Sequence, residues 1–200
     1  MNQPLPEVYL ARHGETAWSL SGRHTGRTDL PLTRRGEDNA RKLRGRLEGI
    51  EFTEVLVSPL QRARRTCELA GFGGVARPTP DLMEWDYGDY EGRLTSDIRL
   101  ERPGWYLFRD GCPGGESLEM VGARADRMIA RLRGDGGHIL LFGHGHFSRI
   151  LAARWIGLSA GDASHLMLST ASLSILSYEH TLDDPAILLW NDDHHLKPGG

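Results

Sequence analysis

Short apolar runs alternate along this chain with segments of helical period, and this alternation restricts its fold more than any other feature. Residues 8–10, 55–57 and 139–142 are continuous apolar runs of strand length. The run 139–142 is typical of a central strand in a parallel sheet, which is buried on both faces. Amphipathic helices are expected over 33–47, 60–70 and 117–132. We therefore predict an α/β fold, a three-layer α/β/α domain with a mostly parallel central sheet.

The rest of the chain fits into the same domain. A further helix is expected over 148–156, and strands over 173–178 and 187–190 should complete the sheet. Residues 94–108 are expected to form a short helical cover. Because no repeat or Gly/Ser/Pro-rich linker divides the 200 residues, we predict a single domain over 5–192. The polar residues 193–200 are expected to form a flexible tail, with His194 and His195 as an exposed pair.

Composition excludes several classes of partner. Lys and Arg total 24 against 27 Asp and Glu, a formal charge of −3, so nothing draws the whole molecule to nucleic acid or to an anionic membrane. No apolar run exceeds the five residues 186–190, and the N-terminus lacks the regions of a signal peptide. The two cysteines are too few for a disulfide scaffold or a four-cysteine zinc site. We expect a soluble, cytoplasmic protein whose partner is a small molecule, and we leave open whether it forms a homo-oligomer.

The first strand ends directly in Arg12-His13-Gly14-Glu15. In open α/β sheets, ligands bind just past the carboxyl ends of the strands. A guanidinium can hold the oxygens of a phosphate while a neighbouring imidazole attacks it or donates a proton, and Gly14 leaves the approach open. This stretch therefore predicts an anion site built on Arg12 and His13.

Two later segments place further phosphate ligands nearby. The long polar loop 19–32 contains Thr25 and Gly26, which could offer a hydroxyl and a backbone N–H to a phosphate oxygen. Ser58 and Pro59 are expected at the N-cap and first position of the next helix. Arg62 would then lie in its first turn, beside a helix N-terminus that itself favours anions.

Candidates for a proton donor and a second histidine come from two further motifs. Aromatic rings surround four acids over 84–92, and a semi-apolar pocket of this kind suits a general acid. Composition does not choose among Glu84, Asp86, Asp89 and Glu91. The central strand ends in Gly143-His144-Gly145-His146, which again places a histidine just past a strand.

Together, these motifs resemble those of the histidine phosphatase superfamily, which includes phosphoglycerate mutases, sugar bisphosphatases and acid phosphatases. The resemblance rests on Arg12-His13-Gly14-Glu15, Ser58-Pro59-Leu60 with Arg62-Ala63, residues 84–92, and Gly143-His144-Gly145, in that order over 8–157. It implies a phosphoglycerate mutase-like fold that needs no metal and no cofactor.

The resemblance also implies roles for individual residues. His13 would be the nucleophile that forms a phosphohistidine, and Glu84 would protonate the leaving alkoxide and then activate water. The groups that hold the transferring phosphoryl oxygens would be Arg12, Arg62 and His144. Positions that line the substrate pocket in relatives are matched by Thr25, Gly26, Tyr87, Gly145 and His146. Ser19 stands where many mutases have Asn, so its phosphate contact is expected to be weaker or made differently.

The resemblance is nearest to a bacterial acid phosphatase branch and the sedoheptulose-bisphosphatase branch. Mutases carry a longer insertion than the lysine-free segment between Gly92 and Gly114, and a short segment should admit water. We therefore predict a phosphomonoesterase for small phosphorylated metabolites, such as sugar phosphates or bisphosphates, with an acidic pH optimum. The alternatives are a phosphoglycerate mutase using the same residues, a non-catalytic phospho-ligand binder, and a metal hydrolase built on His144-x-His146.

Overall fold

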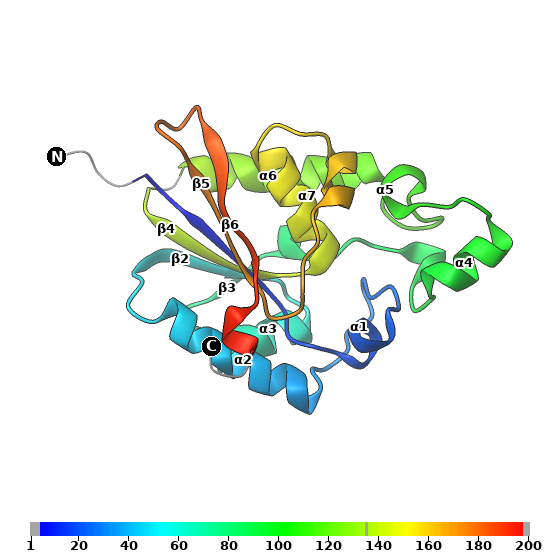
Figure 1. The fold of residues 1–200 in the computed structure, drawn as a ribbon, viewed down its shortest axis with the longest axis horizontal. Helices are drawn as coiled ribbons and strands as arrows, with labels where there is room; N and C mark the ends of the chain where they lie inside the picture. The colour runs from blue at the N-terminus through cyan, green and yellow to red at the C-terminus, as the bar shows by residue number, and fades with distance from the viewer. Residues whose placement is uncertain (1–4, 135, 198–200) are drawn as a thin grey trace.

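A six-stranded sheet runs through the centre of the molecule (Figure 1), with strand order β3-β2-β4-β1-β5-β6. The computed structural model describes residues 5–134 and 136–197. Strands β3, β2, β4 and β1 pair in parallel, whereas β5 and β6 are antiparallel to their neighbours. The strands are β1 (Val8–Arg12), β2 (Phe52–Val57), β3 (Arg77–Pro78), β4 (His138–Gly143), β5 (Leu173–Tyr178) and β6 (Pro185–Asp192). The predicted mostly parallel sheet is confirmed.

Strand β4 lies between β2 and β1 and is buried from Ile139 to Gly143. Its unbroken apolar run reflects this position, because a strand with parallel neighbours on both sides is covered on both faces. The register with β1 pairs Arg12 with Gly143. The two strands therefore end side by side.

Helices cover both faces of the sheet, as predicted (Figure 1). Side chains on successive strand residues point to opposite faces, so Tyr9 and Ala11 join one core with α2 and α3, while Val8 and Leu10 join the other with α6 and α7. These helices are α2 (Arg34–Leu47), α3 (Gln61–Leu69), α6 (Leu118–Gly134) and α7 (Gly145–Trp155). The single free thiol on α3, Cys67, is buried among apolar side chains as expected.

Two helix starts differ from the expected ones. The N-cap of α3 is Leu60, and not Ser58 as predicted, because the Ser58 hydroxyl lies against the ring of His144. Helix α7 begins at Gly145, ahead of the predicted Ser148, with His144 as its extended N-cap residue. The first N–H groups of α7 consequently emerge next to His144.

The remaining segments are short and lie around the carboxyl end of the sheet. The predicted helical cover consists of α4 (Thr95–Glu101) and α5 (Leu107–Asp110), and α1 (Ala17–Ser21) begins the loop that follows β1. Three-residue 3-10 turns form at Pro80–Leu82 and Gly88–Tyr90, and a longer one at Ala160–His165.

The chain end departs from the expected tail. His194–Leu196 form a 3-10 turn, and His195 is buried, with a ring nitrogen 3.0 Å from the Ala171 carbonyl oxygen. The prediction of an exposed His194–His195 pair is therefore wrong for His195, because this turn packs on the core beneath it. Residues 198–200 of the predicted tail lie outside the described residues. Across the described ranges, no helix is long and apolar enough to cross a membrane, and the cytoplasmic location stays a prediction.

Candidate active site

The site lies where β1 and β4 end. His13 and His144 follow the paired residues Arg12 and Gly143, and the His13 N–H continues the ladder by donating to the Gly143 carbonyl oxygen at 3.0 Å. The two imidazole centroids are 5.2 Å apart, and both side chains are buried. The two histidines predicted from separate strand ends therefore form one pair.

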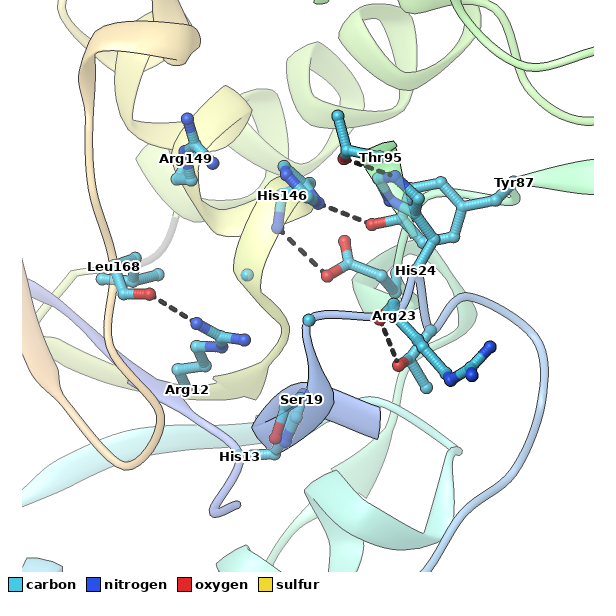
Figure 2. Close-up of a pocket in the computed structure, with 14 residues that line it drawn as sticks. Arg12, His13, Ser19, Arg23, His24, Tyr87, Thr95, His146, Arg149 and Leu168 are labelled. Carbon is cyan, nitrogen blue, oxygen red and sulfur yellow. Dashed lines mark hydrogen bonds between the residues drawn. The ribbon is translucent and has the colours of Figure 1, made fainter. Parts of the chain in front are cut away.

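A cavity of about 260 Å³ opens here, and His13 is among the residues that line it (Figure 2). Eight of the predicted site residues line it: Arg12, His13, Ser19, Thr25, Glu84, Tyr87, Gly145 and His146. Three do not: Arg62, His144 and Gly26.

His13 is held as a neutral imidazole. Its Nδ1–H donates to the Gly14 carbonyl oxygen at 2.7 Å, which leaves the lone pair on Nε2. Burial lowers the pKa of His13 well below 6.5, and the positive charges of Arg62 and Arg12 lower it further. The ring is therefore neutral and its Nε2 unprotonated, as a nucleophile requires.

Gly14 itself serves a different purpose from the one expected. A Cβ at this position would lie 2.4 Å from the carbonyl oxygen of Gly36 on α2. The absent side chain therefore makes room for the start of α2, and the Gly14 N–H donates to the Thr66 hydroxyl of α3 at 3.0 Å. The loop carrying His13 is packed against both helices of this face.

Arg12 offers unused hydrogen-bond donors beside the cavity. One Nη1–H donates to the Leu168 carbonyl oxygen, and the buried Nε has no partner among the described residues. Gly145 allows the guanidinium to lie against the start of α7, since a Cβ there would be 3.1 Å from Arg12 Cζ. A buried N–H without a partner is costly, so Arg12 is prepared for an acceptor such as a phosphate oxygen.

Arg62 lies behind the histidine pair. Its Nε–H donates to His144 Nδ1 at 3.2 Å, and its two Nη atoms donate to the carbonyl oxygens of Thr25, Gly26 and Thr28 at 2.8–3.1 Å. His144 must then carry its proton on Nε2, which lies 2.7 Å from Ser58 Oγ. Burial and the charge of Arg62 lower the pKa of His144 well below 6.5, which agrees with a neutral ring.

Glu84 lines the same cavity as His13. Its carboxylate accepts hydrogen bonds from the backbone N–H groups of Trp85, His146 and Phe147 at 2.9–3.0 Å. Two of these groups belong to the first turn of α7, where a helix favours negative charge. The early start of α7 therefore fixes the carboxylate beside the cavity.

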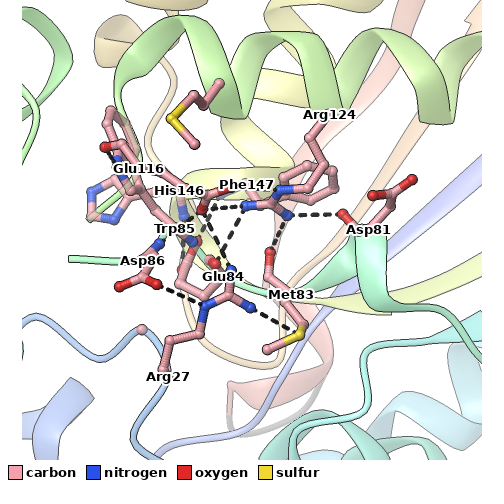
Figure 3. A network of polar contacts seen from close by, with 12 residues as sticks. Arg27, Asp81, Met83, Glu84, Trp85, Asp86, Glu116, Arg124, His146 and Phe147 are labelled. Atoms are coloured by element: carbon pink, nitrogen blue, oxygen red, sulfur yellow. Dashed lines mark hydrogen bonds and ion pairs between the residues drawn. The ribbon is translucent and has the colours of Figure 1, made fainter. Parts of the chain in front are cut away.

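The backbone that carries Glu84 is held by Arg124 of α6 (Figure 3). This buried guanidinium donates to the carbonyl oxygens of Asp81 and Met83 at 2.9 and 2.6 Å, and to the Glu116 carboxylate. Arg124 thus makes two hydrogen bonds to backbone carbonyl oxygens and two to a carboxylate. Because α6 holds Arg124 in place, these contacts leave the backbone at Glu84 little freedom to move.

The structure distinguishes among the four candidate acids, which composition alone could not do. Only Glu84 lines the cavity. Asp86 accepts hydrogen bonds from Arg27 and from the Gly88 N–H, Asp89 is exposed, and Glu91 accepts from backbone N–H groups of the loop that contains Gly26.

The predicted substrate-binding groups are not equally available. The Gly26 N–H already donates to Glu91 at 2.8 Å, so it does not point into the cavity as expected. The Ser19 hydroxyl is committed to the capping box with Thr16. The Thr25 hydroxyl donates to the Arg23 carbonyl oxygen at 3.1 Å.

Tyr87 and His146 form a close pair in the cavity wall. The Tyr87 hydroxyl lies 2.5 Å from His146 Nδ1. Burial raises the pKa of Tyr87 well above 10 and lowers the pKa of His146 well below 6.5. Both groups are therefore neutral, and a hydrogen bond joins them.

Several residues of the cavity wall were missed from the sequence. Arg149 lies one helical turn after Gly145, on the same face of α7, and this four-residue spacing could have revealed it. No spacing in the sequence marks the others, of which Thr95 begins α4. They are Gly22, Arg23, His24, Thr95 and Leu168.

The geometry does not support a metal pair on His144 and His146. Both ring nitrogens of His144 are used, on Arg62 and Ser58, and Nδ1 of His146 is used on Tyr87. Among residues 5–134 and 136–197, no three or more His, Cys, Asp or Glu side chains are grouped as metal ligands would be.

Comparison with known families agrees with this arrangement. The model of the histidine phosphatase superfamily (branch 1) matches residues 8–193. The chain belongs to the histidine phosphatase superfamily. The resemblance inferred from the motifs is thereby confirmed.

Among relatives of this chain, an acid phosphatase of Mycobacterium tuberculosis is 42% identical over 90% of this chain and 91% of its own length. Sedoheptulose 1,7-bisphosphatase of Saccharomyces cerevisiae is 34% identical, over 92% of this chain and 84% of its own. A probable phosphoglycerate mutase of Salmonella choleraesuis is 32% identical, over 88% and 86%.

Solved structures show the same fold. The product of an open reading frame of Mycobacterium tuberculosis superposes on this chain with a TM-score of 0.87 at 38% identity, covering 92% of this chain and 96% of that one. The alpha-ribazole phosphatase of Shigella flexneri gives a TM-score of 0.82 at 28% identity, covering 94% and 96%.

Proposed function

We propose that this protein is a metal-independent phosphomonoesterase that acts on small phosphorylated metabolites through a phosphohistidine on His13. The observation that carries the proposal is the neutral His13 ring, whose Nδ1–H is held by Gly14 while Nε2 is free beside Arg12 and Glu84. An unprotonated nucleophile, a cation with unused donors and a carboxyl group on one cavity are the components of phosphoryl transfer through an enzyme intermediate.

In the first step, His13 Nε2 forms a bond to phosphorus as the bond from phosphorus to the ester oxygen breaks. Arg12 stabilises the equatorial oxygens, and the Nε2–H of His144 does so after exchanging its contact with Ser58 Oγ for one of them, while Arg62 holds the other nitrogen of the ring. Arg62 has five N–H donors, of which four make the hydrogen bonds described above, so one Nη1–H is left for an oxygen. Glu84 gives its proton to the leaving alkoxide, which departs as an alcohol.

In the second step, the Glu84 carboxylate takes a proton from water as the water oxygen attacks phosphorus. The bond from His13 Nε2 to phosphorus breaks, and inorganic phosphate leaves. One carboxyl group can serve both steps because it alternates between its two protonation states.

The cavity supports a small and strongly anionic substrate. Its lining includes the cations Arg12, Arg23 and Arg149 but a single carboxylate, Glu84. Sugar phosphates and bisphosphates fit this charge and a volume of about 260 Å³. Relatives named acid phosphatase and sedoheptulose 1,7-bisphosphatase support this substrate class, and a mycobacterial glucosyl-3-phosphoglycerate phosphatase shares the fold.

Hydrolysis is preferred over return of the phosphoryl group to product. The segment between Gly92 and Gly114 contains only the short helices α4 and α5, and its arginines bind within the segment or to its borders. A long basic lid that would retain a phosphorylated product is not built from this stretch. Water can then reach the phosphohistidine.

The test is single-turnover phosphate release from an aryl phosphate, with and without chelator, for the parent, His13→Ala and the exposed-site control His194→Ala. Chelator-resistant release that is lost only in His13→Ala, with acid-labile phosphate trapped on the parent, is expected. Interconversion of 2- and 3-phosphoglycerate without phosphate release would identify a mutase and overturn the proposal.

A further inference from the structure

The loop Thr25, Gly26, Arg27, Thr28 lies between Arg62 and Glu91. On one side its carbonyl oxygens accept from the Arg62 guanidinium: Thr25 at 3.1 Å, Gly26 at 2.8 Å and Thr28 at 3.0 Å. Arg62 is fully buried, so these oxygens replace the water that would otherwise solvate its charge. The position of the guanidinium therefore depends on the position of the loop.

On the other side, the N–H groups of the same loop converge on the Glu91 carboxylate. Gly26 N–H donates at 2.8 and 3.1 Å to its two oxygens, Thr28 N–H at 3.1 Å, and Arg27 N–H at 3.3 Å. A carboxylate that accepts several backbone N–H groups binds them more strongly than a neutral acceptor would. One side chain thus fixes three consecutive peptide groups.

Gly26 permits this close approach. A Cβ on Gly26 would lie 2.7 Å from Glu91 Oε2 and 2.4 Å from the Trp85 carbonyl oxygen. Backbone hydrogen bonds join the residues next to Gly26 and Glu91. The Gly92 N–H donates to the His24 carbonyl oxygen at 2.8 Å, and the His24 N–H donates to the Arg93 carbonyl oxygen at 3.0 Å. The loop is therefore clamped along its length to the stretch that begins at Glu91.

We infer that Glu91 is a positioning residue for Arg62, and that it acts through the backbone of residues 25–28. This inference rests on the proposed function, in which Arg62 supports the phosphoryl oxygens and His144. Without the carboxylate, three N–H groups lose their acceptor, and the carbonyl oxygens of Thr25 and Gly26, which belong to two of the same peptide groups, shift. The guanidinium follows them, because its only other anchors among the described residues are the Thr28 carbonyl oxygen of the same loop and His144.

The negative charge of Glu91 also stabilises the Arg62 guanidinium. Burial lowers the pKa of Arg62, and the negative charges of Glu84, Asp29 and Glu91 oppose that effect. Glu91 therefore favours the charged guanidinium as well as its position. It does so without lining the cavity, which separates its role from that of Glu84.

The decisive variant is Glu91→Gln, which keeps the shape but replaces one acceptor oxygen by an NH2 donor. Asp89→Asn is the matched control, because it neutralises an exposed acid two residues away. We expect Glu91→Gln to lower kcat/KM for an aryl phosphate and to weaken competitive inhibition by inorganic phosphate, each about tenfold to a hundredfold. Asp89→Asn should match the parent.

Two further readouts distinguish positioning from general destabilisation. Amide hydrogen exchange of residues 26–28 should accelerate in Glu91→Gln, and the double variant Glu91→Gln/Arg62→Ala should be no slower than Arg62→Ala alone, because both act through one group. Additive effects, or unchanged exchange at 26–28, would overturn the inference. So would parent-like kcat/KM and phosphate inhibition in Glu91→Gln.

Failure of the proposed function gives a different pattern. In that case His13→Ala retains the parent's phosphate release, or the parent releases none. Calorimetric binding of inorganic phosphate and the exchange of residues 26–28 still report on the loop then. If Glu91→Gln binds inorganic phosphate and exchanges the amides of residues 26–28 as the parent does, the positioning role of Glu91 is overturned, whatever the outcome for the proposed function.

Discussion

The Nε–H of Arg62 donates to Nδ1 of His144 across 3.2 Å, so the side chain that supports the site also decides which nitrogen of His144 carries a proton. Because an arginine in a protein only donates, Nδ1 of His144 must be the acceptor. Nε2 then carries the proton, which faces Ser58 Oγ at 2.7 Å in this structure and which, in the proposed mechanism, turns to an oxygen of the phosphoryl group.

Arg62→Lys tests this relationship. Lysine keeps the charge but cannot reach His144 and three carbonyl oxygens from one planar group. We expect kcat to fall about 10²- to 10³-fold, the usual effect of losing a preorganised donor. Steady-state kinetics with an aryl phosphate measures it. Arg65→Lys is the control, since Arg65 lies on the same helix and is exposed; a loss below tenfold in Arg62→Lys would contradict the assignment.

The pH dependence of the first step follows from His13. Because burial, Arg62 and Arg12 hold its pKa well below 6.5, the nucleophile stays unprotonated as the solution becomes mildly acidic. The burst of alcohol release should therefore show no decline centred near pH 6.5 when the pH is lowered. Rapid-quench measurement of the burst between about pH 5 and about pH 8 checks this, and a decline centred there would show an ordinary, solvated histidine.

Alanine substitutions at Gly14 and Gly45 serve as test and control for the packing of the His13 loop. Alanine at Gly14 would place a Cβ 2.4 Å from the Gly36 carbonyl oxygen, whereas alanine at Gly45 of α2 meets nothing within 4 Å. Gly14→Ala should lower the free energy of unfolding by about 1–3 kcal/mol and reduce kcat by displacing His13. Gly45→Ala should raise the free energy of unfolding by about 0.5–1 kcal/mol and leave kcat unchanged. Urea unfolding and kcat measure both, and equal stabilities would contradict the packing argument.

Stability should fall on the acidic side through His24. Burial lowers its pKa to about 4 in the folded protein, from 6.5. As the pH falls from 6.5 towards 4, the unfolded chain binds a proton that the folded chain does not, so stability decreases by up to ~3 kcal/mol over this window. Above pH 6.5 this effect is absent.

His24→Phe keeps a ring against Tyr87 and Trp105 and removes the titrating group. The free energy of unfolding, measured by urea between these pH values, should depend less steeply on pH in this variant. His180→Phe, at an exposed position, controls for the loss of a histidine. An unchanged slope in His24→Phe would show that His24 does not resist protonation.

The sheet and the histidine pair could be predicted because local sequence determines them. A continuous apolar run predicts a buried strand, and the residue after it must emerge at the strand end, which is how His13 and His144 were found. Ser58 shows the limit of such reasoning. Its local pattern favours an N-cap, but its hydroxyl lies against His144, which is 86 residues away in the sequence.

Glu84 and Glu91 could not be separated by local sequence, since both are acids beside aromatic rings. What separates them is the partner across the fold: the start of α7 for Glu84, and the loop 25–28 for Glu91. Arg23 and Thr95 were missed for the same reason. Arg23 reaches the cavity from a loop and Thr95 from the first position of α4, and neither position is marked by its local sequence.

The distance between His13 and His144 is the spacing of a hydrogen-bonded sheet. Adjacent strands lie about 4.8 Å apart, and the two imidazole centroids, one residue beyond a paired position, are 5.2 Å apart. The proposed nucleophile and its neighbouring histidine are thus spaced by backbone hydrogen bonds within the core, while loops 19–32 and 93–113 line the cavity that we propose a substrate enters. Those loops can change length and composition without altering the interval between the two rings. A protein built this way can acquire new substrates while its phosphoryl-transfer geometry stays constant.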